Sequence, residues 1–122
     1  MISASVHTLL TTRSSPLLTE VYPVAIPQKA EYPAVRYARI TSNRDMNYDK
    51  VETWIRSVFQ VDSYAPSYNA ALDLAETVKA ALNDYSGGLI QKIRIDFETE
   101  GLEDDVDLYR VMQQYTIWHR ES

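Results

Sequence analysis

The sequence predicts an α+β fold in which two helices pack on one face of a mostly antiparallel β-sheet. Apolar residues recur at helical spacing in residues 3–13 and 67–85, whereas several other segments alternate between apolar and polar side chains. The segments follow one another in the order α-β-β-β-α-β-β, and strands in this order are most simply joined as hairpins. With 122 residues, the chain has the length of one domain, residues 1–122.

In the first half of the chain, one helix is expected at residues 3–13, where serines near its start can cap it. Two prolines confine residues 21–27 to an edge strand or an irregular β arm. Residues 34–41 and 52–64 are rich in β-branched and aromatic side chains and form the next two strands. Between them, residues 42–50 have the composition of a turn.

The second half contains the clearest helix, residues 67–85, whose apolar positions follow steps of four and three. Gly87 and Gly88 are expected to end it. Strands at 89–98 and 108–120 bracket an acidic turn, which predicts that they pair with each other. Six apolar side chains are expected to pack between the second helix and the sheet: Phe59, Val78, Leu82, Ile93, Ile95 and Phe97.

Composition excludes several classes of protein. The chain has no cysteine, which removes a disulfide scaffold, a thiolate zinc site and a cysteine nucleophile. No apolar stretch approaches the roughly 18 residues that span a bilayer, and the first residues lack the features of a secretory signal. We therefore expect a soluble protein, made in the cytoplasm, with no membrane partner. A net charge of −5 also argues against tight binding to nucleic-acid phosphates.

The acidity is concentrated in one segment. Seven of the 17 acids lie between Asp96 and Asp107 with no base among them. The segment lacks the glycine and the spaced glutamate of an EF-hand loop, so a solvated hairpin turn is the simpler interpretation than a calcium site. A third interpretation is a surface that repels polyanions or meets a basic partner. Composition does not decide between these.

No catalytic constellation is visible. His7 and His119 do not stand in a recognisable spacing with a serine or an aspartate. The glycine pair at 87–88 precedes a strand, whereas a phosphate site needs a helix N-terminus there. We therefore expect no enzymatic activity, cofactor or bound metal. Nine tyrosines and two tryptophans are more than the core needs and favour protein–protein contacts.

Several segments in order resemble a known family, the small tail terminator and tail-completion proteins of long-tailed phages, prophages and gene transfer agents. They are Val21-Tyr22-Pro23 after the first helix, Tyr32-Pro33-Ala34-Val35-Arg36-Tyr37, Val58-Phe59-Gln60-Val61-Asp62-Ser63-Tyr64-Ala65, the alanine-rich residues 70–82, and residues 108–121. Together they cover nearly the whole chain. The break at Arg13-Ser14-Ser15-Pro16 and the acidic turn depart from the family's pattern.

The resemblance implies a virion structural protein that assembles as a homo-oligomeric ring, commonly a hexamer. Such a ring would cap the head-proximal end of the tail tube, end its polymerisation and face a head connector or head-closure protein. DNA would be only passing cargo, and assembly would take place in the host cytoplasm. Three alternatives are another neck component such as a head-closure protein, a small acidic protein-binding module, and a metal-dependent enzyme that uses the acids.

Two polar turns are the candidate contact sites, facing either partners or the lumen of the ring. Their residues are Arg44, Asp45, Met46, Tyr48, Glu98, Glu100, Glu103, Asp104, Asp105 and Asp107. The acids admit two uses. They can line a lumen that does not bind DNA phosphates, or they can pair with Arg36, Arg39 or Arg56 of a neighbouring subunit.

Overall fold

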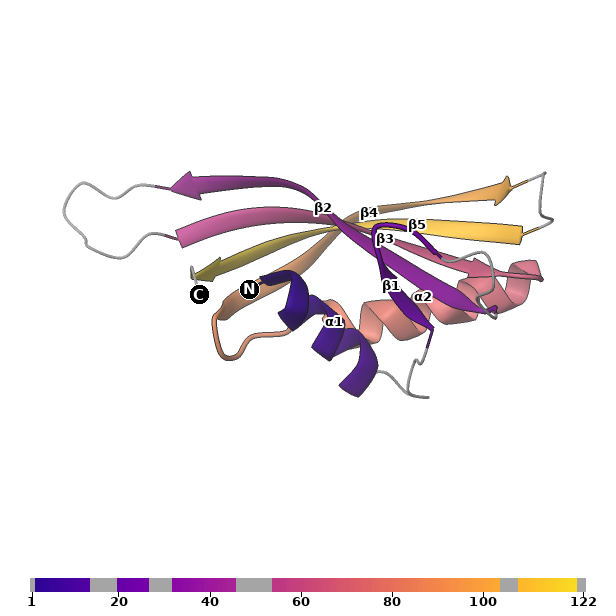
Figure 1. Ribbon diagram of the computed structural model, residues 1–122, viewed down its shortest axis with the longest axis horizontal. Helices are drawn as coiled ribbons and strands as arrows, with labels where there is room; N and C mark the ends of the chain where they lie inside the picture. Colours follow the sequence, from indigo (N-terminus) through magenta and orange to yellow (C-terminus); the bar gives the residue numbers. More distant parts are fainter. Residues whose placement is uncertain (1, 14–19, 27–31, 46–53, 104–107, 121–122) are drawn as a thin grey trace.

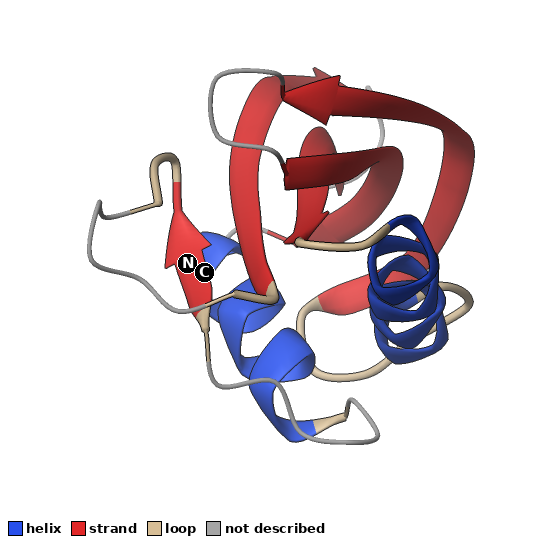
Figure 2. Ribbon diagram, turned by 90° about the vertical axis from the view of Figure 1, so that its right-hand side faces the viewer, coloured by secondary structure: helices blue, strands red, loops and turns tan. Residues whose placement is uncertain are grey.

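The computed structural model describes residues 2–13, 20–26, 32–45, 54–103 and 108–120. Its elements are α1 (Ile2–Thr12), β1 (Val21–Pro23), β2 (Ala34–Asp45), β3 (Trp54–Ala65), α2 (Tyr68–Leu82), β4 (Ile90–Glu103) and β5 (Leu108–Arg120). This order confirms the predicted α-β-β-β-α-β-β arrangement. Both helices lie on one side of the sheet (Figure 1), and along the long axis the strands arch over them (Figure 2).

The sheet has five strands in the order β1-β2-β3-β5-β4. β2, β3, β5 and β4 pair antiparallel, and the expected partnership of the last two strands is confirmed. Two connections differ from simple hairpins. β1 runs parallel to β2, at the sheet edge that its prolines predict. After β3, helix α2 leads the chain to β4 at the opposite edge of the sheet. β5 then returns to the position between β3 and β4.

Helix α2 forms where the apolar stripe predicts it. The Ser67 side chain caps its first turn by accepting a hydrogen bond from the Ala70 backbone N–H at 3.2 Å. The helix ends at Leu82, earlier than expected, with Asn83 as its C-cap. The predicted stop at Gly87 was wrong because Asn83 already has an extended ψ of 135° and Asp84 a positive φ of 64°, so Tyr85 lies outside the helix.

The core lies between the sheet and the two helices. Phe59, Val78, Leu82 and Ile93 are buried together, as predicted, and Ile95 packs against them while partly buried. The prediction for Phe97 was wrong, since its side chain is 45% exposed. A β-bulge between Ile95 and Phe97 is the reason, because one extra residue shifts the following side chains to the other face.

The strands are longer than the sequence indicated. β2 continues through residues 42–45 and β4 through residues 99–103, segments predicted as turns. A strand face that is open to solvent needs no apolar side chains, and Ser42, Thr99 and Gly101 are exposed. None of the helices in the described ranges combines the length and the apolar character that crossing a membrane requires.

Candidate interaction surfaces

The two candidate turns belong to hairpins at opposite ends of the molecule. Asp45 pairs with Trp54, which pairs with Arg120 at the end of β5. Glu103 pairs with Leu108 at the start of β5. β5 therefore separates the two hairpin ends by its own length of 13 residues, about 40 Å at 3.3 Å per residue. Figure 1 shows the two hairpins at opposite ends of the sheet, and the hairpin of β2 and β3 extends beyond the helices.

The first turn begins later in the chain than predicted. Arg44 and Asp45 are the last residues of β2, within the sheet and not in a loop. Met46 and Tyr48 lie outside the described residues. The structure thus places part of this candidate contact region on a strand edge.

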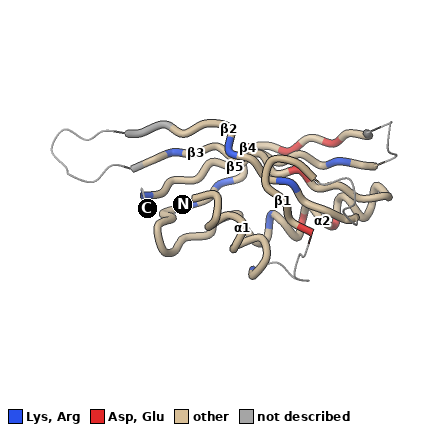
Figure 3. Tube along the Cα trace, viewed as in Figure 1, with Lys and Arg blue, Asp and Glu red and all other residues tan. Residues whose placement is uncertain are grey.

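The acidic segment is also largely strand. Glu98, Glu100 and Glu103 belong to β4, whereas Asp104, Asp105 and Asp107 lie outside the described residues. In Figure 3, the acidic residues of β4 lie in the half of the strand that is farther from the chain termini. The acids described are therefore spread along one edge of the sheet.

Two of these acids have partners within the chain. The buried Gln113 donates from Nε2 to Glu98 Oε2 at 3.0 Å and to the Ala75 carbonyl of α2 at 3.1 Å. Tyr68 donates its hydroxyl to Glu100 Oε1 at 2.7 Å, and this bond raises the pKa of the tyrosine. Both glutamates thus turn toward the helices, the direction that the bulge gives them.

Gln113 is held from its other side as well. The hydroxyl of Tyr115 donates to Gln113 Oε1 at 2.9 Å, and both side chains are fully buried. Burial, with the nearby Glu98 charge second, raises the pKa of Tyr115 far above its ordinary value. This polar connection between β5, β4 and α2 has no signal in the sequence, because glutamine in a strand looks like an outward position.

The helix-free face of the sheet contains a buried ion pair. The carboxylate of Asp62 on β3 is fully buried and contacts the guanidinium of Arg36 on β2, which donates from Nε at 3.0 Å. Gln60 also donates to both carboxylate oxygens at 3.2 and 3.0 Å. Arg36, one of the bases considered for contact with a neighbouring subunit, therefore already has an acidic partner in its own subunit.

Asp96 is anchored on the same helix-free face. It accepts hydrogen bonds from the Thr116 hydroxyl at 2.5 Å and from Arg94 Nε at 3.2 Å. The Arg94 guanidinium also lies over the ring of Trp118, 5.1 Å from its centre. The first acid of the acidic segment is thus part of the subunit's own surface network.

One histidine has serine neighbours that sequence spacing did not reveal. Ser57 Oγ lies 2.7 Å from His119 Nε2 and 2.8 Å from Ser42 Oγ, and His119 Nδ1 lies 2.9 Å from the Arg120 carbonyl. Ser57 is fully buried and His119 is 4% exposed. A nucleophile must reach its substrate, and a carboxylate normally orients the base. This cluster meets neither requirement and joins strands β2, β3 and β5.

The burial of His119 predicts that the protein loses stability in acid. Burial, reinforced by the Arg39 charge, lowers its pKa below the ordinary value of about 6.5. The folded state then binds fewer protons than the unfolded chain, so the histidine's contribution is present above pH 6.5 and lost as pH falls through the folded pKa. In urea denaturation between pH 7.5 and 5, the wild type should lose more stability than His119→Gln, which cannot titrate. Parallel pH profiles would contradict this.

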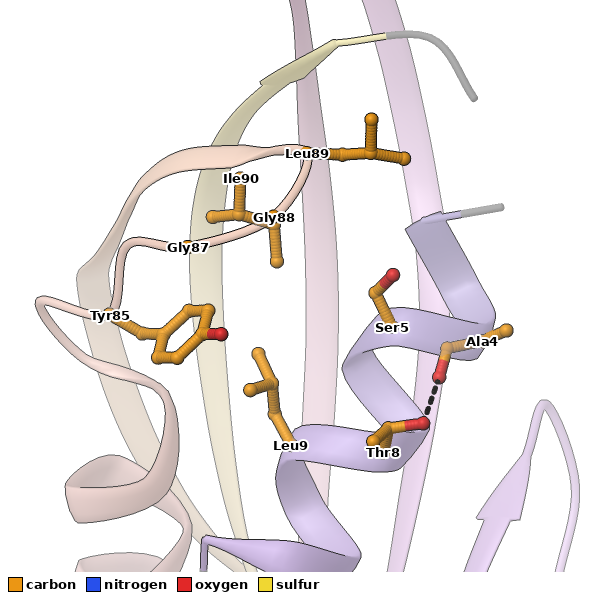
Figure 4. A pocket seen from close by; sticks show the side chains of 9 residues that line it. All are labelled: Ala4, Ser5, Thr8, Leu9, Tyr85, Gly87, Gly88, Leu89 and Ile90. Atoms are coloured by element: carbon orange, nitrogen blue, oxygen red, sulfur yellow. Dashed lines mark hydrogen bonds between the residues drawn. The ribbon is translucent and has the colours of Figure 1, made fainter.

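A shallow pocket of about 300 Å³ lies between α1 and the loop that enters β4. In Figure 4, Leu9 and Tyr85 reach toward each other across it, with Gly87 behind. A Cβ at Gly87 would lie 2.7 Å from the Tyr85 hydroxyl oxygen, and the positive φ of 155° also favours glycine at this loop position. None of the described residues lining the pocket is charged. Nor do any three histidine or carboxylate side chains of the described ranges cluster in a way that could hold a metal ion.

Comparisons with known proteins found a similar solved structure and a matching family. A chain in a structure described as the virion of a native gene transfer agent particle has the same fold, with a TM-score of 0.61 and 15% sequence identity. The match covers 97% of this chain and 86% of that one. None of the curated proteins matches the chain. The family described as tail completion protein gp17 matches residues 3–120, and the chain belongs to that family.

Proposed function

We propose that the protein is a tail terminator, a virion structural protein that caps the head-proximal end of a phage tail tube. It ends tube polymerisation and presents a surface for joining the head. Membership of the tail completion family over residues 3–120 is the observation that carries this proposal. Its partners are then further copies of itself in a ring of six, the tail tube protein, and a head connector or head-closure protein.

The shape of the subunit supports two-sided contacts. Its two hairpins end about one strand length apart, at opposite ends of the sheet. A subunit between a tube and a head needs separate surfaces for each, and these ends provide them. The networks described use buried or partnered polar groups to join strands, which is a structural use and not a catalytic one. DNA passes through the ring as cargo.

The acidic segment has two proposed uses in such a ring. The acids can line the lumen, where negative charge does not bind DNA phosphates. They can instead contact bases of a neighbouring subunit, for which Arg39 and Arg56 are exposed. Changing Glu103, Asp104 and Asp105 together to their amides separates these uses. Rings that persist while DNA ejection slows support the lumen, whereas weaker rings support contacts between subunits.

Electron microscopy of particles made without the protein tests the function. We expect headless tails of irregular and excessive length together with unjoined heads, because nothing would stop tube growth. Supplying the wild-type protein in trans should restore the normal length. Tails of normal length joined to heads would contradict the proposal. Normal-length tails with unjoined heads would point to a head-closure component.

A further inference from the structure

One edge of the sheet is half covered by the chain itself. Asp84 N–H donates to the Ile93 carbonyl at 2.9 Å, and Ile95 N–H donates to Asn83 Oδ1 at 2.9 Å. These bonds satisfy outward backbone groups in the first half of β4. Along residues 97–103, no described residue pairs with the outer side of the strand. A strand edge with unpaired N–H and C=O groups is a template for another strand.

The opposite edge of the sheet is half covered in the same way. β1 pairs with residues 35–37 of β2, and Val24 N–H continues the pairing by donating to the Tyr37 carbonyl at 2.8 Å. Beyond this point, none of the described strands lies beside the outer side of residues 38–45. Within the described ranges, each sheet edge therefore has one free half with no strand beside it, and each free half lies toward the hairpin end of its strand.

The two free halves differ in charge. Residues 97–103 contain three glutamates and no base, whereas residues 38–45 contain two arginines and one aspartate. Pairing two copies of β4 with each other would place acid against acid, which opposes the contact. Both halves also have exposed apolar side chains, 45% for Phe97, 51% for Leu102 and 49% for Ile40. Opposite charges and apolar groups together favour contact between unlike edges.

We propose that residues 97–103 of β4 in one copy pair with residues 38–45 of β2 in the next copy. The three antiparallel pairings inside the sheet make β2 and β4 run in opposite directions, so copies in the same orientation pair antiparallel across this contact. The contact joins unlike surfaces, and such contacts form a ring when the rotation between neighbouring copies closes. This inference rests on the proposed ring and names the surfaces that build it.

The positions of the free halves also suit closure. They lie toward opposite ends of the strands, so neighbouring copies are displaced along the strand direction. A sheet that closes on itself needs such a stagger, because its strands tilt relative to the axis.

Cysteine cross-linking in assembled particles tests the contact, since the natural chain contains no cysteine. Thr41 on β2 and Thr99 on β4 are exposed and pair internally with Val58 and Met112, on the helix-free face. In particles made with T41C/T99C, a short bismaleimide should convert most of the protein into a ladder of covalent oligomers. Neighbouring strands lie about 4.8 Å apart, within reach of such a reagent across several registers.

The single variants and a matched pair define the other outcomes. T41C alone and T99C alone should remain monomeric on denaturing gels, as should D73C/T99C, which places one cysteine on the exposed side of α2. Dimers from T99C alone would mean that two β4 edges meet and would overturn the proposal. An absence of cross-links in T41C/T99C particles of normal infectivity would overturn it as well. A different result would contradict the proposed function, namely tails of normal length joined to heads in particles made without the protein.

Discussion

Replacing Leu82 with alanine is expected to lower the free energy of unfolding by about 2–5 kcal/mol. Leu82 is 1% exposed and packs in the core that α2 shares with the sheet. The substitution removes buried methyl groups and leaves a cavity that the surrounding strands fill only in part. Urea denaturation followed by circular dichroism measures the loss as a shift of the transition midpoint.

Leu82→Met is the matched control because it keeps the side-chain volume nearly constant. It should cost less than about 1.5 kcal/mol. A loss below about 0.5 kcal/mol for Leu82→Ala would mean that α2 does not use this face against the sheet. Equal losses for both variants would point to a requirement for leucine's shape and not for buried volume.

Replacing Arg36 with methionine is expected to cost about 3 kcal/mol, the lower end of the range for breaking a buried ion pair. The substitution keeps much of the side chain's apolar stem but leaves the fully buried carboxylate of Asp62 without its cationic partner. Gln60 still donates two hydrogen bonds to that carboxylate, which moderates the loss. Chemical denaturation at neutral pH measures it.

Two further variants separate the pair from its surroundings. Arg56→Met removes an exposed arginine from the neighbouring strand and should change stability by less than about 0.5 kcal/mol. The double variant Arg36→Met/Asp62→Leu removes both charges and should recover most of the loss, because no unpaired charge remains buried. A double variant as unstable as Arg36→Met alone would show that the loss comes from packing.

The periodicity of apolar residues predicted the architecture well, because burying one face of a helix or strand imposes that periodicity. Residues such as Ile55, Phe59 and Val61 alternate in β3 because one face of that strand meets the helices, and all three are buried. The stripe of α2 follows the same rule at helical spacing. In residues 42–45 and 99–103 the alternation of apolar and polar side chains is missing, so no pattern distinguishes a strand from a turn.

The buried polar contacts beneath the candidate surfaces could not be predicted from the spacing of residues in the sequence. Gln113, Asp62 and His119 are polar residues in strands, and each has hydrogen-bond partners far away in the sequence. Such partners are defined by strand register, which depends on bulges that periodicity does not contain. The charged residues at 44–45 and 98–107 were visible in the sequence, but their assignment to turns hid the fact that residues 44–45 and 98–103 belong to strands.

The bulge beside Phe97 affects how this chain compares with its relatives. One inserted residue reverses the phase of the remaining strand, sending Glu98 and Glu100 toward the helices and Phe97 away from them. A relative with a regular strand here would align with a one-residue gap near Asp96. After that gap, its apolar positions would match glutamates of this chain. Substitution scores would record divergence there even if the two backbones were the same apart from that single residue.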